Sequence, residues 1–216
     1  MIGGRVHTMP IRKSLALIVA LAISPVSSAI ADQLLVCGWD KVFLLETSAS
    51  APGKAERLWT WDAKQSSDLP ESLRATFKTT DDCKPVDGGS RVLISSSSGG
   101  CALVARPSGR AVWYARVPNA HSVEMLPRDR IVTAASTHAK GNRLMLFDVA
   151  RPDQIVWEAP LYSAHGVVWD AERRCLWALG FKELQCYELE DWDSDKPALT
   201  MKASYTLPST GGHDLQ

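Results

Sequence analysis

Two stretches of the sequence, His121-Ser-Val-Glu-Met-Leu-Pro and His165-Gly-Val-Val-Trp-Asp-Ala, align without a gap and decide the fold. Each begins with histidine and continues into an apolar run of similar length. These runs are Arg130-Ile-Val-Thr-Ala-Ala and Arg174-Cys-Leu-Trp-Ala-Leu, which start at the same distance from the two histidines. The chain therefore repeats one unit along its length.

The same unit recurs on both sides of these two stretches. Asp82 stands in the place of the histidines before Arg91-Val-Leu-Ile-Ser-Ser, and His213 begins a further copy. The gaps between Asp82, His121, His165 and His213 are 39, 44 and 48 residues, which is the length of one four-stranded blade of a β-propeller. The sequence predicts an all-β fold, a β-propeller with about four blades present, in which these four polar residues converge on one axis.

Short apolar, β-branched runs separated by turn residues fill the rest of the chain, as is typical of an all-β protein. The units close with a strand that carries tryptophan, at 58–61, 111–114 and 155–158. We expect these large side chains to pack one sheet on the next. The helical candidate is 69–77, which Asp68 would cap.

The first unit lacks its opening strand. Residues 33–43 align with the second and third strands of the later units, and His213 is followed by only three residues. In propellers such a gap is normally filled from the carboxyl end of the chain, which removes the exposed strand edges. A closed four-bladed ring would be cramped, so we expect the amino-terminal part of a larger, six- to eight-bladed propeller whose C-terminal blades are missing here.

Residues 1–31 predict an export signal. Arg5, Arg12 and Lys13 precede the apolar run 15–23, and Ala29-Ile-Ala supplies small residues before Asp32. The run is too short to span a bilayer comfortably, so we expect no membrane insertion. The sequence thus predicts one propeller domain, 32–216, in the periplasm or outside the cell.

Charge and cysteine content narrow the classes of partner. The signal holds three of the 24 basic side chains and none of the 24 acidic ones, so residues 32–216 carry a net charge of −3. Without a basic run, nucleic-acid binding is not expected. The five cysteines permit two disulfides in an oxidising compartment. Cys175 with Cys186 across a hairpin is the first candidate, and Cys83 with Cys101 a weaker one; the alternative is that most are buried apolar residues.

The four converging polar residues are chemically suited to two kinds of site. Imidazole and carboxylate groups bind divalent zinc, manganese or iron, so Asp82, His121, His165 and His213 are candidate ligands for a divalent metal or for a small molecule. Without a metal, the three histidines are candidate catalytic bases near neutral pH. Asp214 would then orient a neighbouring imidazole.

A structural interpretation stands beside the functional one. A histidine near the start of an inner propeller strand can be held by a polar turn residue, for which Asp129, Asp170 and Glu124 are candidates. The structural interpretation is favoured by the fact that repetition alone produces equivalent residues. The change from histidine to Asp82 in one unit favours a function. His138 is expected on an exposed loop.

The repeated units that begin at His121 and His165 resemble those of exported bacterial β-propeller proteins of uncharacterised function, with blades like those of WD40 and quinoprotein propellers. The resemblance covers 34–216. It extends distantly to oligogalacturonate lyases, and it would make His121, His165 and His213 ligands or bases in polysaccharide elimination.

Three functions follow from these patterns. The first is a secreted propeller that binds a small molecule or glycan at its central face, with no proven catalysis. The second is a metal- or histidine-dependent polysaccharide lyase or hydrolase. The third is a structural propeller for protein interaction.

Overall fold

The computed structural model describes residues 32–47 and 53–215 and is an all-β protein with short helical turns. The expected export signal, 1–31, lies outside the described residues. Within them, no helix combines the length and apolar character needed to cross a membrane. The elements are β1 (Asp32–Gly38), β2 (Lys41–Thr47), β3 (Ala55–Asp62), η1 (Ala63–Gln65), α1 (Glu71–Arg74), β4 (Thr80–Val86), η2 (Asp87–Gly89), β5 (Arg91–Ser96), β6 (Gly100–Ala105), β7 (Ala111–Arg116), β8 (Ala120–Leu126), β9 (Arg130–Ala135), β10 (Arg143–Asp148), β11 (Ile155–Pro160), β12 (Gly166–Asp170), β13 (Cys175–Leu179), β14 (Glu183–Glu190) and β15 (Ala198–Thr206).

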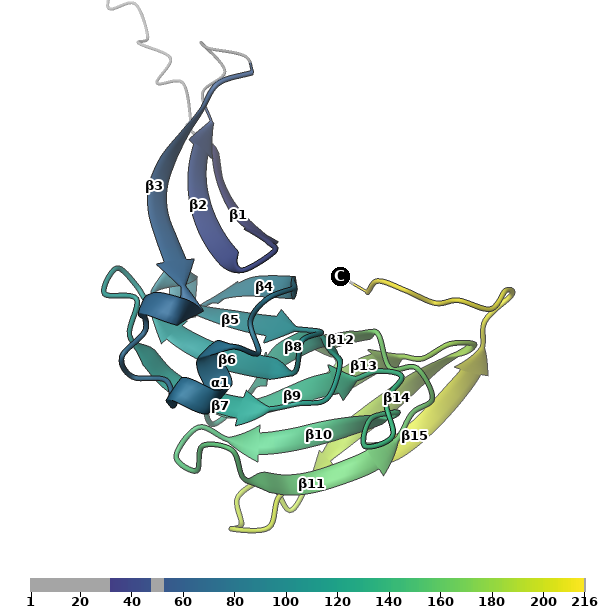
Figure 1. The fold of residues 1–216 in the computed structure, drawn as a ribbon. Helices are drawn as coiled ribbons and strands as arrows, with labels where there is room; N and C mark the ends of the chain where they lie inside the picture. The colour runs from purple at the N-terminus through teal and green to yellow at the C-terminus, as the bar shows by residue number, and fades with distance from the viewer. Residues whose placement is uncertain (1–31, 48–52, 216) are drawn as a thin grey trace, which may run out of the picture.

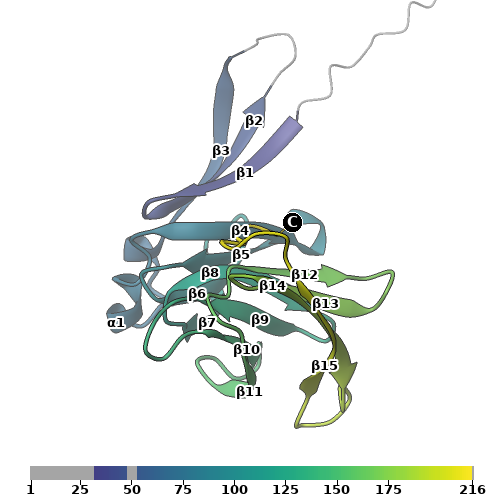
Figure 2. The same cartoon turned by 90° about the vertical axis from the view of Figure 1, so that its right-hand side faces the viewer.

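Each predicted unit forms its own antiparallel sheet of sequential strands. The first sheet has three strands, β1-β2-β3, and the others have four: β4 to β7, β8 to β11 and β12 to β15. The opening strands β4, β8 and β12, which we call the inner strands, lie side by side, and β1 lies against β4. The first sheet extends away from the other three (Figures 1 and 2). This arrangement is consistent with a propeller-like fold.

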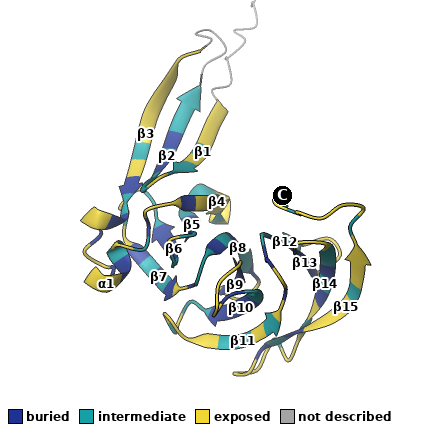
Figure 3. Ribbon diagram, turned by 45° about the vertical axis from the view of Figure 1, so that its right-hand side comes forward, coloured by how far each residue is buried: buried dark blue, intermediate teal, exposed yellow. Residues whose placement is uncertain are grey.

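The second strand of the middle sheets explains the continuous apolar runs in the sequence. All six residues of β9 are buried, as are the last five of β5. A strand with a sheet against each of its faces buries side chains of both orientations, so hydrophobic and polar residues do not alternate along it. The colouring in Figure 3 follows this pattern, with buried strands inside and exposed strands at the periphery.

Three hydrophobic clusters join consecutive sheets. The predicted packing role of the closing-strand tryptophans is confirmed, because each cluster holds an aromatic pair that includes one of them. Edge-on contact of this kind stabilises a pair beyond the burial of its surface. The ring centroids are 5.2 Å apart for Trp61 and Phe77, 5.4 Å for Trp113 and Phe147, and 5.9 Å for Trp157 and Tyr187.

The helix expected over 69–77 is a single turn. It occupies α1 and begins after Pro70, and no side chain caps it, so the capping role expected of Asp68 is wrong. Leu73 and Phe77 are buried in the cluster between the first and second sheets. The segment therefore covers the core between two sheets. The spacing of its apolar residues follows from this contact and does not indicate a longer helix.

The five cysteines are free thiols in the structure. Cys186 stands opposite Trp177, two residues along β13 from Cys175, so the two cysteines of the first candidate pair share one face of the fourth sheet. Cys83 packs on the cluster between the first and second sheets, whereas Cys101 is buried in the cluster between the second and third. The pairing of Cys83 with Cys101 is therefore wrong, because the second sheet separates the two side chains.

Trp113 offers a test of how consecutive sheets are held together. It is fully buried, and its indole N–H has no hydrogen-bond partner in the described part of the chain. Trp113→Ala should lower the free energy of unfolding by about 3–5 kcal/mol, whereas Trp113→Phe should cost roughly half of that or less because no hydrogen bond is lost. Urea unfolding of both variants measures the difference. Equal losses would contradict the assignment of a packing role.

Candidate functional site

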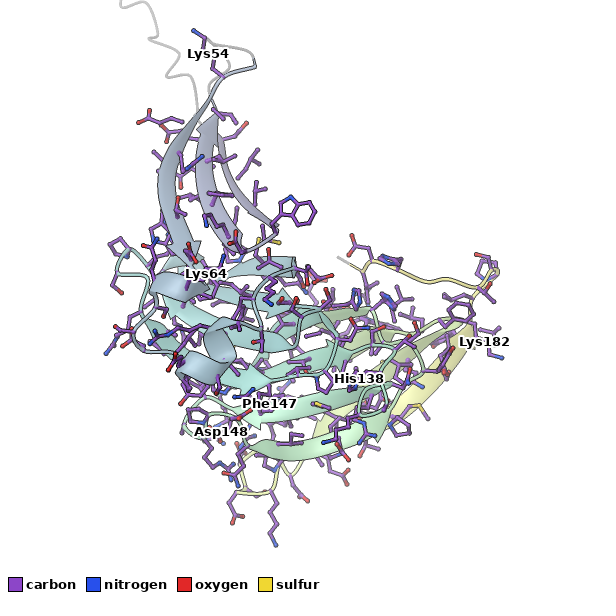
Figure 4. All side chains as sticks on the ribbon, in the orientation of Figure 1. Lys54, Lys64, His138, Phe147, Asp148 and Lys182 are labelled. Atoms are coloured by element: carbon purple, nitrogen blue, oxygen red, sulfur yellow. The ribbon has the colours of Figure 1, made fainter. Side chains whose placement is uncertain are left out.

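The predicted site residues lie at the end of the sheets where the inner strands begin. Two backbone hydrogen bonds tie these strand starts to neighbouring turns: Thr80 N donates to Trp39 O at 2.7 Å, and Ser136 N donates to Asn119 O at 2.8 Å. The turns between the second and third strands therefore lie at the same end. His138 and Lys182 are on two of these turns (Figure 4), and His138 is exposed, as predicted.

The three predicted histidines come together here. The ring centroids of His121 and His165 are 4.3 Å apart, those of His165 and His213 are 4.6 Å apart, and those of His121 and His213 are 6.1 Å apart. They come from β8, from the residue before β12, and from the segment after β15. We call these three residues the histidine cluster. The prediction that equivalent imidazoles converge is confirmed by these distances.

The carboxylate that faces the histidine cluster is Asp81. Its Oδ1 lies 3.3 Å from His121 Nδ1. Asp81 and His121 are both bulge residues, because the pairing register shifts between Thr80 and Asp82 and between Ala120 and Ser122. A bulge leaves its extra residue unpaired and turns its side chain away from the regular alternation.

The equivalence of Asp82 with His121 is therefore wrong by one residue. Val86 pairs with Arg91 in the second sheet, whereas Leu126 pairs with Arg130 in the third. Four residues separate the first pair and three the second. The extra residue lies in the turn that contains η2, and an alignment without gaps cannot detect it.

Asp82 instead links the inner strands. Its Oδ2 accepts hydrogen bonds from Ser122 Oγ at 2.9 Å and from Val123 N at 3.3 Å. Ser122 Oγ in turn accepts a hydrogen bond from Val167 N at 3.3 Å. The residue after Asp81 and the residue after His121 thus each accept a backbone N–H from the next inner strand. These bonds connect strands that belong to different sheets and satisfy otherwise unpaired buried N–H groups.

Lys84 is the main cation beneath the histidine cluster. Its Nζ donates to Val167 O at 2.7 Å and to Glu124 Oε2 at 3.1 Å, and lies 3.5 Å from Asp82 Oδ2. All three inner strands therefore meet at one ammonium group. Burial raises the pKa of Glu124, and the nearby Lys84 opposes that rise.

His165 is held in one orientation by its surroundings. Its Nδ1 lies 2.7 Å from Ser163 O, 3.1 Å from Ser163 Oγ and 3.3 Å from Ser136 Oγ. A carbonyl oxygen only accepts, so the hydrogen-bond pattern assigns the proton to Nδ1 and leaves the Nε2 lone pair as an acceptor. Nε2, which lies 3.5 Å from Ser136 Oγ, is then the nitrogen that could act as a general base.

The partners proposed for a purely structural histidine are engaged elsewhere. Glu124 contacts Lys84, Asp129 contacts Arg91, and Asp170 contacts Arg173. His165 does have internal hydrogen bonds, as the structural interpretation requires, but they come from Ser163, which precedes β12, and Ser136, which follows β9.

The surroundings of His121 shift the pKa of its imidazole. Burial lowers its pKa; Asp81 opposes that shift, and His165 and His213 add to it. At neutral pH the imidazole of His121 is therefore neutral. A neutral imidazole provides one hydrogen-bond donor and one acceptor to a bound molecule.

The segment that carries His213 approaches the fourth sheet through glycines. A Cβ at Gly166 would lie 2.6 Å from Leu215 Cβ and 3.1 Å from its N. Phe181 O accepts from Gly211 N at 2.7 Å and from Gly212 N at 3.1 Å. Residues 211–215 thus run from the turn between β13 and β14 to the start of β12, without forming a strand.

Two hollows open at this end of the sheets. The smaller, about 190 Å³, is lined by Asp81, Asp82, His121, Ser122, His165, His213 and Asp214. The larger, about 900 Å³, lies between turns of the second and third sheets, and its polar lining includes Arg116, Asn119, His138, Lys140, Arg143 and Glu158. Within 32–47 and 53–215, no group of three or more His, Cys, Asp or Glu side chains has the geometry of a metal site. The divalent metal thus gains no support from the side-chain geometry and stays a prediction.

A family model described as "Family of unknown function (DUF6528)" matches residues 43–216. The chain belongs to this family. The match includes every residue of the histidine cluster and the two aspartates beside it. No curated protein matches the sequence. Membership of the DUF6528 family therefore assigns no activity to the site.

Sequence reasoning missed three contributors to this site. Asp81 was adjacent to the predicted aspartate, and only the turn length distinguishes the two. Ser122 directly follows a predicted histidine, and that position in the sequence was the signal that could have identified it. Lys84 carried no signal, because its contact with Val167 joins residues that are 83 positions apart.

Ser122 tests the connection between inner strands. Ser122→Ala removes the donor to Asp82 and leaves Val167 N–H without its acceptor. The free energy of unfolding should fall by about 1–3 kcal/mol, which is the usual cost of an unsatisfied buried group. Urea unfolding measures the loss, with Ser209→Ala in an exposed loop as the matched control. A loss no larger than that of the control would contradict the proposed link.

His121 makes stability depend on pH. Its folded pKa is lowered, so the unfolded chain binds more protons at mildly acidic pH. The contribution is present above the ordinary histidine pKa and is lost as pH falls through the folded pKa. The free energy of unfolding should therefore fall as the pH drops below about 6.5, the ordinary histidine pKa, and His121→Gln should flatten that fall.

The comparison isolates His121 because the groups around it are present in both proteins. These groups are Asp81, Asp82, Lys84, His165 and His213. His138→Gln, on an exposed turn, is the control variant. Equal pH dependence in the wild type and in His121→Gln would show that this imidazole does not titrate as described.

Proposed function

We propose that the protein is an exported β-propeller that binds a small molecule or glycan at the central face, over the histidine cluster. The four sheets are the blades in this proposal, and residues 213–215 continue the series of inner strands. The larger ring of six to eight blades stays a prediction from the repeat pattern. The export signal read in residues 1–31 supports a periplasmic or secreted location.

The observation that carries the proposal is a set of exposed aromatic side chains at the same end of the sheets as the polar hollow. Trp39 is 82% exposed, Tyr162 is 59% exposed and Phe181 is 38% exposed. Single exposed hydrophobic residues are normal on protein surfaces, whereas several at one end of a fold are typical of a binding surface. A flat apolar ring beside hydrogen-bonding groups suits a sugar, which has apolar C–H faces and polar hydroxyl edges.

Backbone hydrogen bonds tie these aromatic residues to the starts of the inner strands. Trp39 O accepts from Thr80 N, one residue before Asp81. Phe181 N donates to Tyr162 O at 3.0 Å, and Phe181 O accepts from Gly212 N, one residue before His213. The aromatic rings and the histidine cluster thus share one end of the molecule. Loops at one end of a rigid scaffold are a common place for a binding site.

Titration calorimetry with a panel of neutral and acidic oligosaccharides tests the proposal. Trp39→Ala should weaken binding by about two- to tenfold, in line with the loss of one aromatic contact. His165→Ala should weaken it further, because a hydrogen-bonding group beside the ligand is lost. Met201→Ala is the control, since Met201 is 52% exposed but lies in the middle of β15. Failure of the wild-type protein to bind any member of the panel would favour the structural, protein-interaction propeller instead.

A polysaccharide lyase or hydrolase is the second candidate function. The tautomer of His165 favours it, because Nδ1–H is bonded to Ser163 O and Nε2 is left to accept a proton. In a lyase, Nε2 would remove the proton next to the sugar carboxylate. The ultraviolet absorbance of the unsaturated product distinguishes this activity from binding alone, and a fully active His165→Ala variant would exclude His165 as the base.

A further inference from the structure

The first sheet is attached to the rest of the protein along a short contact. Figure 1 shows β1, β2 and β3 extending away from the second sheet, with the junction at the turn between β1 and β2. Two hydrogen bonds at this junction come from Thr80, whose N donates to Trp39 O at 2.7 Å and whose Oγ1 donates to Lys41 O at 3.4 Å. Trp39 belongs to the aromatic group described above, so its position depends on this junction.

Two cysteines meet at the same junction. Cys37 is in β1 opposite Val42, and Cys83 is in β4 opposite Ile94. Both pack against the cluster between the first and second sheets, where β1 lies against β4. Cys101, by contrast, is fully buried on the other side of the second sheet. The two half-buried thiols therefore face each other across the boundary between two sheets.

We propose that Cys37 and Cys83 form a disulfide that fixes the first sheet to the second. Two S–H bonds break and one S–S bond forms. The two electrons and two protons pass to an oxidising disulfide, either oxidised glutathione or an oxidoreductase, which becomes two thiols. Formation in the cell rests on the export proposed above, because the cytosol keeps thiols reduced.

The pKa values of the two thiols are shifted in opposite directions. The hydrogen bond from Cys83 lowers the pKa of Cys37, and burial and the nearby Asp82 oppose this. The same hydrogen bond raises the pKa of Cys83.

Peptide mapping of the full chain tests the bond. The protein is equilibrated in reduced or oxidised glutathione, alkylated without reduction, and digested with trypsin. After oxidation, the peptide that ends at Lys41 should be joined to the peptide 79–91, which contains Cys83, whereas Cys101 should be alkylated. Recovery of Cys37 and Cys83 as separate alkylated peptides, or joined to other cysteines, would overturn the proposal.

Thermal unfolding provides a second readout. Oxidation should raise the Tm of the wild-type protein by about 5–15 °C, because the bond closes a long loop. Cys37→Ser and Cys83→Ser should each abolish this redox-dependent shift, whatever their own stability, and Cys186→Ser should retain it. A redox-dependent Tm shift that persists in Cys37→Ser would show that another pair of cysteines causes the stabilisation, and would overturn the proposal. Neither measurement involves a ligand or export. The disulfide can therefore be absent while the proposed binding function holds, and binding can fail while the disulfide forms.

Discussion

The structure depends on how backbone groups are satisfied where one sheet meets the next. The inner strands belong to separate sheets and share no ladder of hydrogen bonds. Asp82 and Ser122 replace that ladder, because each accepts an N–H from the neighbouring strand. This short link fixes the spacing of the strands. That spacing places the ring centroids of His121 and His165 4.3 Å apart. The geometry of the site therefore depends on how the backbone N–H groups of the inner strands are satisfied.

The repeat in the sequence was sufficient to predict the division into sheets, the closing strands with tryptophan and the convergence of the histidines. These features depend on local patterns of apolar residues and on equal spacing, both of which are visible in one sequence. Asp81 could not be identified in the same way, because one extra residue in the turn after β4 shifts the register. Turn length changes the equivalence of positions without disturbing the apolar pattern.

Contacts across sheet boundaries were the least predictable. Lys84 reaches Val167 O two strands away, and Cys37 meets Cys83 between two sheets. Such contacts depend on the angle between neighbouring sheets and on which face of a strand turns toward the junction. The shared sheet face of Cys175 and Cys186 follows from the strand register, whereas a contact between sheets requires the three-dimensional arrangement.

Gly166 has a consequence for the make-up of the histidine cluster. The backbone of Leu215 rests where a side chain at 166 would project, so the absence of a single methyl group admits the third imidazole. Two of the rings belong to the scaffold, and the third is delivered by a tail that follows the last sheet. A larger side chain at position 166 would displace residues 213–215. The histidine cluster would then lose His213 although no histidine had been substituted.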